Sequence, residues 1–267
     1  MNIKKRLIPC VIIVVVTLGC VLLSRFTRLA FFTALAVVSA FELQSVLFQA
    51  ELTVSKTLLS VYIIAQAVLC WFGVSVGWMV ALFAATAFVA MFWGVLVPKR
   101  GGRFAVANLF ALMWPFGFYA VILHAAASSM WLPVLTLAVL GAWACYSMAL
   151  VGGKFLGKHK LARTVSPHKT WEGAIVGGLF ALLAGWLIYL ALGSVIHVDM
   201  APCIVIAFVA SCFGQIGDLA ASLIKRMADV KDYGHLMPEH GGIMDKTDSM
   251  LFAIPAAYLC LLVMGIV

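Results

Sequence analysis

Asp218 is the first of several acidic side chains whose positions suggest chemistry, and it lies at the end of a long apolar run. If the chain is helical there, one face carries this acid together with Ser222, Lys225 and Asp229. An acid at the edge of an apolar run is costly unless it is paired or bound to a cation, so it is a candidate for a functional site. An Asp that merely ends a helix at an interface is the alternative explanation.

Two further acids, Asp245 and Asp248, are three residues apart, so they share a face if a helix begins there. The glycine pair 241–242 precedes them and lets the backbone approach a ligand closely. Carboxylates beside several cations suit Mg²⁺, which usually binds through carboxylates and substrate phosphates. His235 and His240 lack the helical spacing of zinc ligands, and hydrogen bonding within the loop explains each of them better.

A third group of polar residues lies in the segment 153–172, which combines Lys with Ser, Thr and Gly. Pro167 breaks a helix, and Ser166 or Thr170 can cap the next one. Cations, hydroxyls and a helix N-terminus together make a cradle for phosphate. A basic loop that touches anionic lipid headgroups explains the composition as well, although Glu172 beside a span then needs a partner or a task.

The elements that must position these residues are membrane helices. The chain is 65% hydrophobic and 10% charged, whereas a soluble domain carries about 25% charge. We therefore expect an all-α, polytopic integral membrane protein with about nine transmembrane helices. The predicted spans are 7–23, 29–48, 57–74, 77–97, 104–123, 132–152, 173–193, 201–219 and 249–267.

The distribution of charge supports this topology. With the N-terminus in the cytoplasm, every Lys and Arg except Arg25 and Arg28 lies on the cytoplasmic side. Most acids lie in or beside the predicted cytoplasmic loops 153–172 and 218–248. We therefore predict a transmembrane scaffold over residues 1–130 and a transmembrane catalytic region over residues 131–267. The remaining acids are Glu42, Glu51 and Asp199.

Glu42 is the one acid that lies clearly within the first seven predicted spans. It either faces the interior of a helix bundle or lies near the outer end of the site. Taken together, the residues predict a metal-and-phosphate site at the membrane surface. Composition takes this no further than phosphoryl or nucleotidyl chemistry.

Five short motifs occur in order in the C-terminal half: 157–161 (GKHKL), 166–173 (SPHKTWEG), 222–226 (SLIKR), 231–232 (KD) and 240–248 (HGGIMDKTD). This order resembles the signature of the phosphatidate cytidylyltransferases, the CDP-diacylglycerol synthases. The resemblance covers about residues 140–267, and the N-terminal half is similar only in having spans of suitable number.

The resemblance implies an enzyme of phospholipid biosynthesis that converts CTP and phosphatidic acid to CDP-diacylglycerol and pyrophosphate. It implies Mg²⁺ as cofactor and leaves a second cation open. It also implies a homodimer in the inner (cytoplasmic) membrane with the active site on the cytoplasmic side, and no nucleic-acid partner. The lipid phosphate would supply its own nucleophile, so a protein base is optional.

The resemblance also assigns roles to residues. The implied metal ligands are Asp218, Asp245 and Asp248. The implied catalytic residues are Asp218, Asp245, Lys225 and Arg226. The implied substrate-binding residues are Lys158, Ser166, Lys169, Thr170, Ser222, Lys231, His240, Gly241, Gly242 and Lys246.

Two positions depart from the family pattern. Lys246 stands where the family usually has Arg, which keeps the charge and loses the bidentate fork. Tyr146 stands where the family tends to place an Asp. These departures keep open a divergent, low-activity or inactive paralogue. A polyprenol kinase, a CDP-archaeol-type synthase and a transporter are further alternatives, the last disfavoured because charge concentrates in loops.

Overall fold

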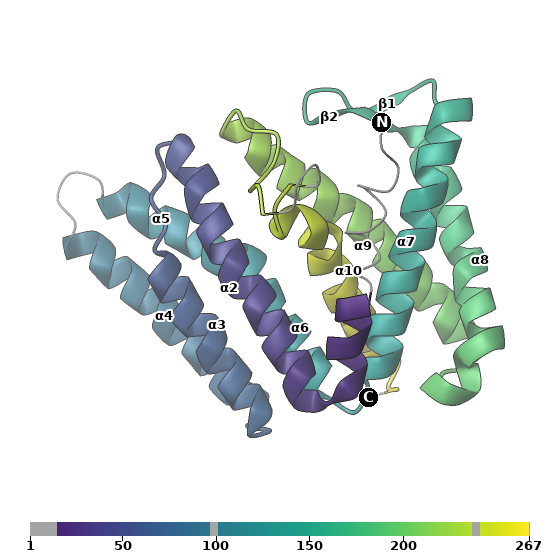
Figure 1. Ribbon diagram of the computed structural model, residues 1–267, viewed down its shortest axis with the longest axis horizontal. Helices are drawn as coiled ribbons and strands as arrows, with labels where there is room; N and C mark the ends of the chain where they lie inside the picture. Colours follow the sequence, from purple (N-terminus) through teal and green to yellow (C-terminus); the bar gives the residue numbers. More distant parts are fainter. Residues whose placement is uncertain (1–14, 97–100, 237–240, 267) are drawn as a thin grey trace. The chain divides into compact units, whose positions relative to one another are not determined.

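The structure is a computed structural model that describes residues 15–96, 101–236 and 241–266. Helices make up almost all of it, and one small two-stranded sheet accompanies them (Figure 1). The elements are α2 (Arg25–Gln49), α3 (Lys56–Trp71), α4 (Val76–Leu96), α5 (Gly101–Ala111), η1 (Leu112–Gly117), α6 (Phe118–Ala127), α7 (Trp131–Leu156), β1 (Lys160–Ala162), β2 (Ser166–Thr170), α8 (Trp171–Ile196), α9 (Met200–Met227) and α10 (Met244–Val263).

Among the described residues, seven helices are long and apolar enough to cross a membrane. One of them is the combined helix Gly101–Ala127, and the shorter apolar helix α3 has 16 residues. The predicted span 7–23 lies partly outside the described residues. Its described part, residues 15–23, is helical. The all-α membrane class is therefore confirmed, while the count of nine spans and the cytoplasmic N-terminus stay predictions.

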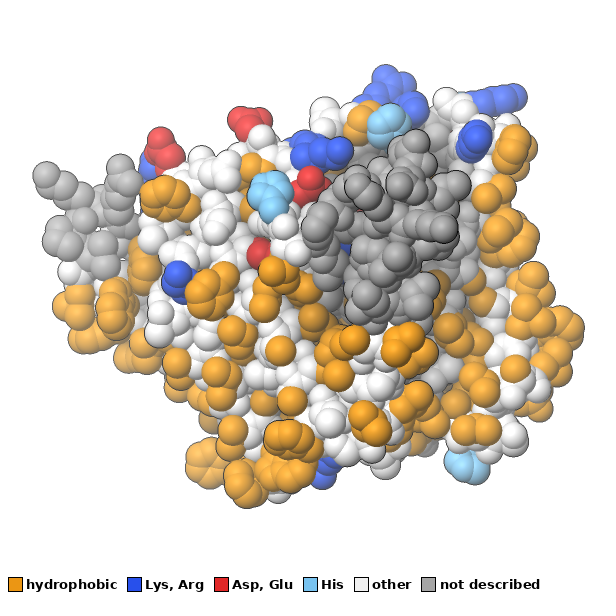
Figure 2. Space-filling model, viewed as in Figure 1, with side chains coloured by type: hydrophobic (Ala, Val, Ile, Leu, Met, Phe, Trp, Pro, Cys, Tyr) orange, Lys and Arg blue, Asp and Glu red, His pale blue; other side chains and the backbone are white. Residues whose placement is uncertain are grey.

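Apolar side chains cover the flanks of these helices. Val95 is 81% exposed and Phe88 is 74% exposed, both on α4. Figure 2 shows hydrophobic side chains spread widely over the visible surface. Such exposure opposes folding in water but suits contact with lipid, because hydrocarbon tails solvate apolar side chains.

The chain divides into two compact units, of which the first comprises Met1–Ala127 and Asp232–Met244. Within it α2 packs against α3 and α6, and α4 packs against α5. The Arg28 guanidinium is buried and donates to the carbonyl of Ala126, so its charge is satisfied by backbone at a helix end. The scaffold predicted over residues 1–130 did not include residues 232–244, which also belong to this unit.

The helix predicted over 104–123 is interrupted. Trp114 has φ −139° and ψ 125°, outside the helical range, within the π-helical segment η1. Pro115 follows it and explains the break, because proline has no N–H to donate and disfavours helical backbone at the residue before it.

The second unit comprises Ser128–Lys231 and Asp245–Val267. Its helices α7, α8 and α9 pack against one another at close range. A Cβ added at Gly185 would lie 2.7 Å from the carbonyl oxygen of Cys203, so glycine is needed for this approach. Close packing of this kind holds α8 against α9, the helix that carries Asp218, Ser222 and Lys225.

A β-hairpin connects α7 to α8 in this second unit. Strands β1 and β2 are antiparallel, with Lys160 opposite Thr170 and Ala162 opposite Ser166. Thr170 is the N-cap of α8, and its side chain accepts a hydrogen bond from the Gly173 N–H at 3.2 Å. Of the two capping residues proposed from sequence, Thr170 is therefore the one that caps.

Candidate active site

The face predicted on α9 forms because this helix runs to Met227, well past the predicted end of its span at 219. Asp218, Ser222 and Lys225 lie along it, and the Ser222 hydroxyl donates to Asp218 Oδ1 at 3.5 Å. Asp229 lies beyond the end of the helix with φ 52°, so it does not continue the face.

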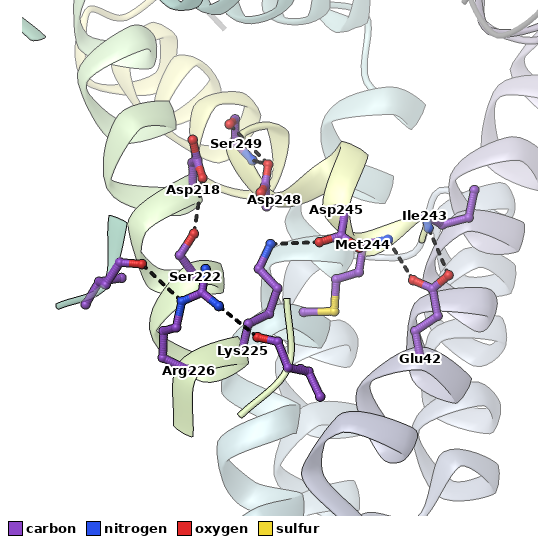
Figure 3. A network of polar contacts seen from close by, with 12 residues as sticks. Glu42, Asp218, Ser222, Lys225, Arg226, Ile243, Met244, Asp245, Asp248 and Ser249 are labelled. Carbon is purple, nitrogen blue, oxygen red and sulfur yellow. Dashed lines mark hydrogen bonds and ion pairs between the residues drawn. The ribbon is translucent and has the colours of Figure 1, made fainter. Parts of the chain in front are cut away.

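Helix α10 begins at Met244, so Asp245 lies in its first turn and Asp248 one turn further on. The ammonium of Lys225 donates to Asp245 Oδ1 at 2.7 Å (Figure 3). The two side chains are only 11% and 7% exposed. This is a buried ion pair between α9 and α10, and a buried pair is strongly destabilised when one partner is removed.

The backbone of Asp248 on α10 closely approaches Gly217 on α9. A Cβ added at Gly217 would lie 2.6 Å from the carbonyl oxygen of Asp248. The Asp248 carboxylate is buried and accepts from the backbone N–H of Ser249 at 2.6 Å and from the Ser249 hydroxyl at 3.2 Å. Figure 3 shows Asp218 and Asp248 on these two neighbouring helices.

A second ion pair joins the β-hairpin to α9. The Lys169 ammonium on β2 lies 2.7 Å from Asp218 Oδ2, and the side chains are 25% and 22% exposed. The sequence suggested both residues for the site but did not predict that they would pair.

A cavity of about 530 Å³ opens beside this second pair. Four of the predicted site residues line it: Ser166, Lys169, Thr170 and Asp218. Sequence reasoning had not assigned site roles to six other polar residues that line it: Lys154, Lys160, His168, Ser211, Gln215 and Ser249. The two lysines and the histidine belong to the basic segment 153–172, which was the available signal. Tyr146 also lines the cavity, at the position where an Asp was expected.

Several other predicted residues do not line this cavity. The Arg226 guanidinium donates to the carbonyls of Val165 at 3.4 Å and Val230 at 3.1 Å. The side chains of Lys158, Lys231 and Lys246 are exposed. His240 lies outside the described residues.

Glu172, the acid beside a predicted span, accepts hydrogen bonds in the structure. Its carboxylate accepts from the backbone N–H groups of Lys158 at 3.1 Å and His159 at 3.2 Å. It also lies 2.6 Å from His159 Nδ1. These contacts hold the chain between α7, which carries Lys154, and β1, which carries Lys160.

The glycine pair 241–242 belongs to the first unit. Gly241 has φ 82°, which favours glycine. The backbone at Gly242 closely approaches the carboxylate of Glu42, whereas the sequence suggested approach to a ligand. In the sequence, Glu42 was noticeable only because it is an acid inside an apolar span.

Within the described part of the chain, no three His, Cys, Asp or Glu side chains are grouped so that they could hold a metal by themselves. A metal bound here needs oxygen ligands from elsewhere, and Mg²⁺ commonly takes them from substrate phosphates and water. The assignment of Asp218, Asp245 and Asp248 as ligands stays a prediction.

Comparison with known proteins identifies the family of this chain. The curated phosphatidate cytidylyltransferase of Bacillus subtilis (strain 168) is 41% identical over 119 residues, 45% of this chain and 44% of that protein. Those of Staphylococcus aureus (strain COL) and Staphylococcus epidermidis (strain ATCC 12228) are 40% and 37% identical over 122 and 120 residues, each covering 45% of both chains. The chain thus matches less than half the length of these relatives. The match to the cytidylyltransferase family itself covers residues 4–264, so this chain belongs to that family, as its motifs predicted.

Proposed function

We propose that this protein is a phosphatidate cytidylyltransferase that converts CTP and phosphatidic acid to CDP-diacylglycerol and pyrophosphate. The single observation that carries the proposal is the cavity in which Lys154, Lys160 and Lys169 line the same space as Asp218. The reaction brings together two anionic substrates, so a cavity for it needs several cations and a carboxylate for a metal.

In the proposed reaction, a phosphate oxygen of phosphatidic acid attacks the α-phosphorus of CTP and forms a new P–O bond. The bond from that phosphorus to the bridging oxygen breaks, and the electron pair leaves with pyrophosphate. The attacking phosphate is already anionic, so no side chain must remove a proton. The protein's contribution is to hold both anions in line and to stabilise the leaving charge.

The lysines of the cavity suit the binding part of this task. The ammonium groups of Lys154, Lys160 and Lys169 bind phosphate oxygens through charge-assisted hydrogen bonds. Asp218 holds Lys169 at 2.7 Å, which limits the positions that this ammonium can take. The hydroxyl of Thr170 is engaged by the Gly173 N–H and fixes the start of α8 beside the cavity.

Mg²⁺ fits this donor set as the cofactor. One or two carboxylates together with substrate phosphates are its usual ligands, and Asp218 offers a carboxylate in the cavity. Asp245 and Asp248 are the further candidates, and a second cation is part of the same proposal. When bound, Mg²⁺ supplies neutralising charge to the phosphates of the nucleotide.

The proposal also includes orientation and assembly. Four basic residues lie on or beside the strands of the hairpin: Lys158, Lys160, Arg163 and Lys169. Because cytoplasmic loops carry an excess of cations, our proposal places the hairpin on the cytoplasmic side of the inner membrane. A protease site inserted at 163–165 should be cut in inverted vesicles and protected in sealed right-side-out vesicles. The family resemblance favours a homodimer, which the mass of the detergent-solubilised protein tests.

The reaction itself is tested with purified protein, Mg²⁺ and CTP labelled at either the α- or the γ-phosphate. Transfer of CMP carries the α label into lipid and releases the γ label as pyrophosphate. A polyprenol kinase would instead carry the γ label into lipid. Parallel reactions contain phosphatidic acid, a polyprenol or an archaeal ether-lipid phosphate, and a matched set contains EDTA in place of Mg²⁺.

We expect α label in lipid only with phosphatidic acid and Mg²⁺. Transfer of the γ label would refute the nucleotidyl transfer, and preference for another lipid would refute the proposed substrate. Absence of transfer with every lipid would favour the inactive paralogue, whose simplest cause is Tyr146. In that case Tyr146→Asp should create activity.

A further inference from the structure

Glu42 is an acid in the apolar helix α2, and its carboxylate is directed to backbone rather than to a cation. It is 8% exposed. Its Oε1 accepts from the N–H of Ile243 and its Oε2 from the N–H of Met244, both at 2.8 Å (Figure 3). A carboxylate buried in this way is stabilised by its two backbone donors, which use both of its oxygens.

The loop before α10 is built to admit this carboxylate. A Cβ added at Gly242 would lie 2.5 Å from Glu42 Oε1, and one added at Gly234 would lie 2.8 Å from the same atom. Real Cβ atoms do not come so close, so a side chain at either position would push the carboxylate away. Two glycines of the loop therefore leave room for one acid that is about 200 residues away in the sequence.

The amides that Glu42 accepts from are those at the start of α10. Met244 is the first residue of that helix, and the first N–H groups of a helix have no partner within it. A negative charge at this end also interacts favourably with the helix dipole. Glu42 thus acts as a capping group supplied by a distant segment, in place of a local Ser, Thr or Asp.

The residue that follows Met244 is Asp245, which pairs with Lys225. Because a peptide bond joins Met244 to Asp245, the backbone that Glu42 holds is the backbone that leads into this acid. We infer that Glu42 is a positioning residue for the reaction: it fixes the 241–244 backbone and with it the first turn of α10. This inference rests on the proposed function, and it gives Glu42 a different role from the ion carrier that a transporter would need.

The test compares Glu42→Gln with the parent in the full-length, detergent-solubilised protein. Glutamine keeps the shape and replaces one accepting oxygen by an NH₂ group that cannot accept from an amide. We expect faster hydrogen–deuterium exchange at the amides of residues 243–248. We also expect turnover per folded molecule to fall about 10-fold to 100-fold, because small misplacement of a catalytic group is costly.

Two further variants keep the test decisive. Gly242→Ala disturbs the same contact from the loop side and should speed hydrogen–deuterium exchange over the same residues. Glu51→Gln is the matched control: Glu51 is exposed and 3.5 Å from Arg103, and its substitution should change neither exchange nor turnover. Glu42→Asp keeps the charge on a shorter side chain and should retain more activity than Glu42→Gln.

Unchanged exchange at 243–248 in Glu42→Gln would overturn the inference, whatever the activity. Faster exchange with unchanged kcat and KM would also overturn it, because the contact would then be structural only. A parent protein that transfers no label would refute the proposed function instead. The exchange data would still decide whether Glu42 holds the loop.

Discussion

Two lysine–aspartate pairs in the second unit have the same N–O distance and different surroundings. Lys225 and Asp245 are 2.7 Å apart with side chains 11% and 7% exposed. Lys169 and Asp218 are also 2.7 Å apart, but their side chains are 25% and 22% exposed and both line the cavity.

The two pairs differ in side-chain exposure, and we expect this difference to give them different roles. A pair whose side chains line a cavity can exchange its partner for a ligand that enters this cavity. A pair buried between two helices loses much more when one partner is removed, because the remaining charge has no solvent to stabilise it. We therefore expect the Lys169–Asp218 pair to govern activity and the Lys225–Asp245 pair to govern stability as well.

The largest expected effect is on the buried pair. Asp245→Ala removes the carboxylate that the Lys225 ammonium faces and should destabilise the protein by about 3–5 kcal/mol. Unfolding of the purified protein in detergent measures this. The double substitution Lys225→Met with Asp245→Leu should regain most of the stability without regaining activity. A loss below about 1 kcal/mol for Asp245→Ala would contradict the contrast between the pairs.

The next effect is on activity. Asp218→Asn should lower the rate of CMP transfer about 100-fold, which corresponds to about 2.7 kcal/mol, since it removes the carboxylate of the cavity. The unfolding free energy should change by less than about 1 kcal/mol, because the pair is partly exposed. Asp199→Asn is the control, since Asp199 is exposed at the other end of α9 and its side chain forms no cap. Equal loss of stability in the Asp218 and Asp245 variants would contradict the comparison.

A smaller effect is expected from Lys169, the cation of the pair that lines the cavity. Lys169→Met should reduce kcat/KM about 10-fold to 30-fold, in line with the loss of one hydrogen bond to a charged phosphate. Steady-state rates at varied CTP and varied phosphatidic acid show which substrate it contacts. Arg163→Met removes an exposed charge from the hairpin turn and should leave both constants within about 2-fold.

The smallest effect concerns Arg226, which the motifs suggested as catalytic. Its guanidinium bonds to the carbonyls of Val165 and Val230, so Arg226→Gln should lower the rate by less than about 3-fold. The same transfer assay measures it. A loss of 100-fold would return this residue to the catalytic set and would show that it moves to the substrate.

The helices themselves were largely predictable, but the ends that carry the site were not. The span predicted as 201–219 corresponds to α9, which continues to Met227. The span predicted as 249–267 corresponds to α10, which begins at Met244. In both cases the polar turns at the site interrupt the apolar signal, so hydropathy ends before the helix does.

Within the site, the types of residue were predictable and their partners were not. The basic segment 153–172 was recognised, and Lys154 and Lys160 were missed only as individual members of it. The hairpin β1–β2 was not anticipated, since two short strands leave little periodicity to detect. Glu42 stood out as an acid in an apolar span, but nothing local in the sequence relates it to residues 243 and 244.

The amino-acid sequence alone determined the helical membrane class, the clustering of acids and bases in two segments, and the family motifs. These properties follow from composition and from spacing within a few turns of one helix. The tertiary structure alone decided which lysines Asp218 and Asp245 face, which residues line the cavity, and that Glu42 caps α10. The physical reason is that such pairings depend on short distances between residues far apart in the chain, which packing sets and local spacing does not encode.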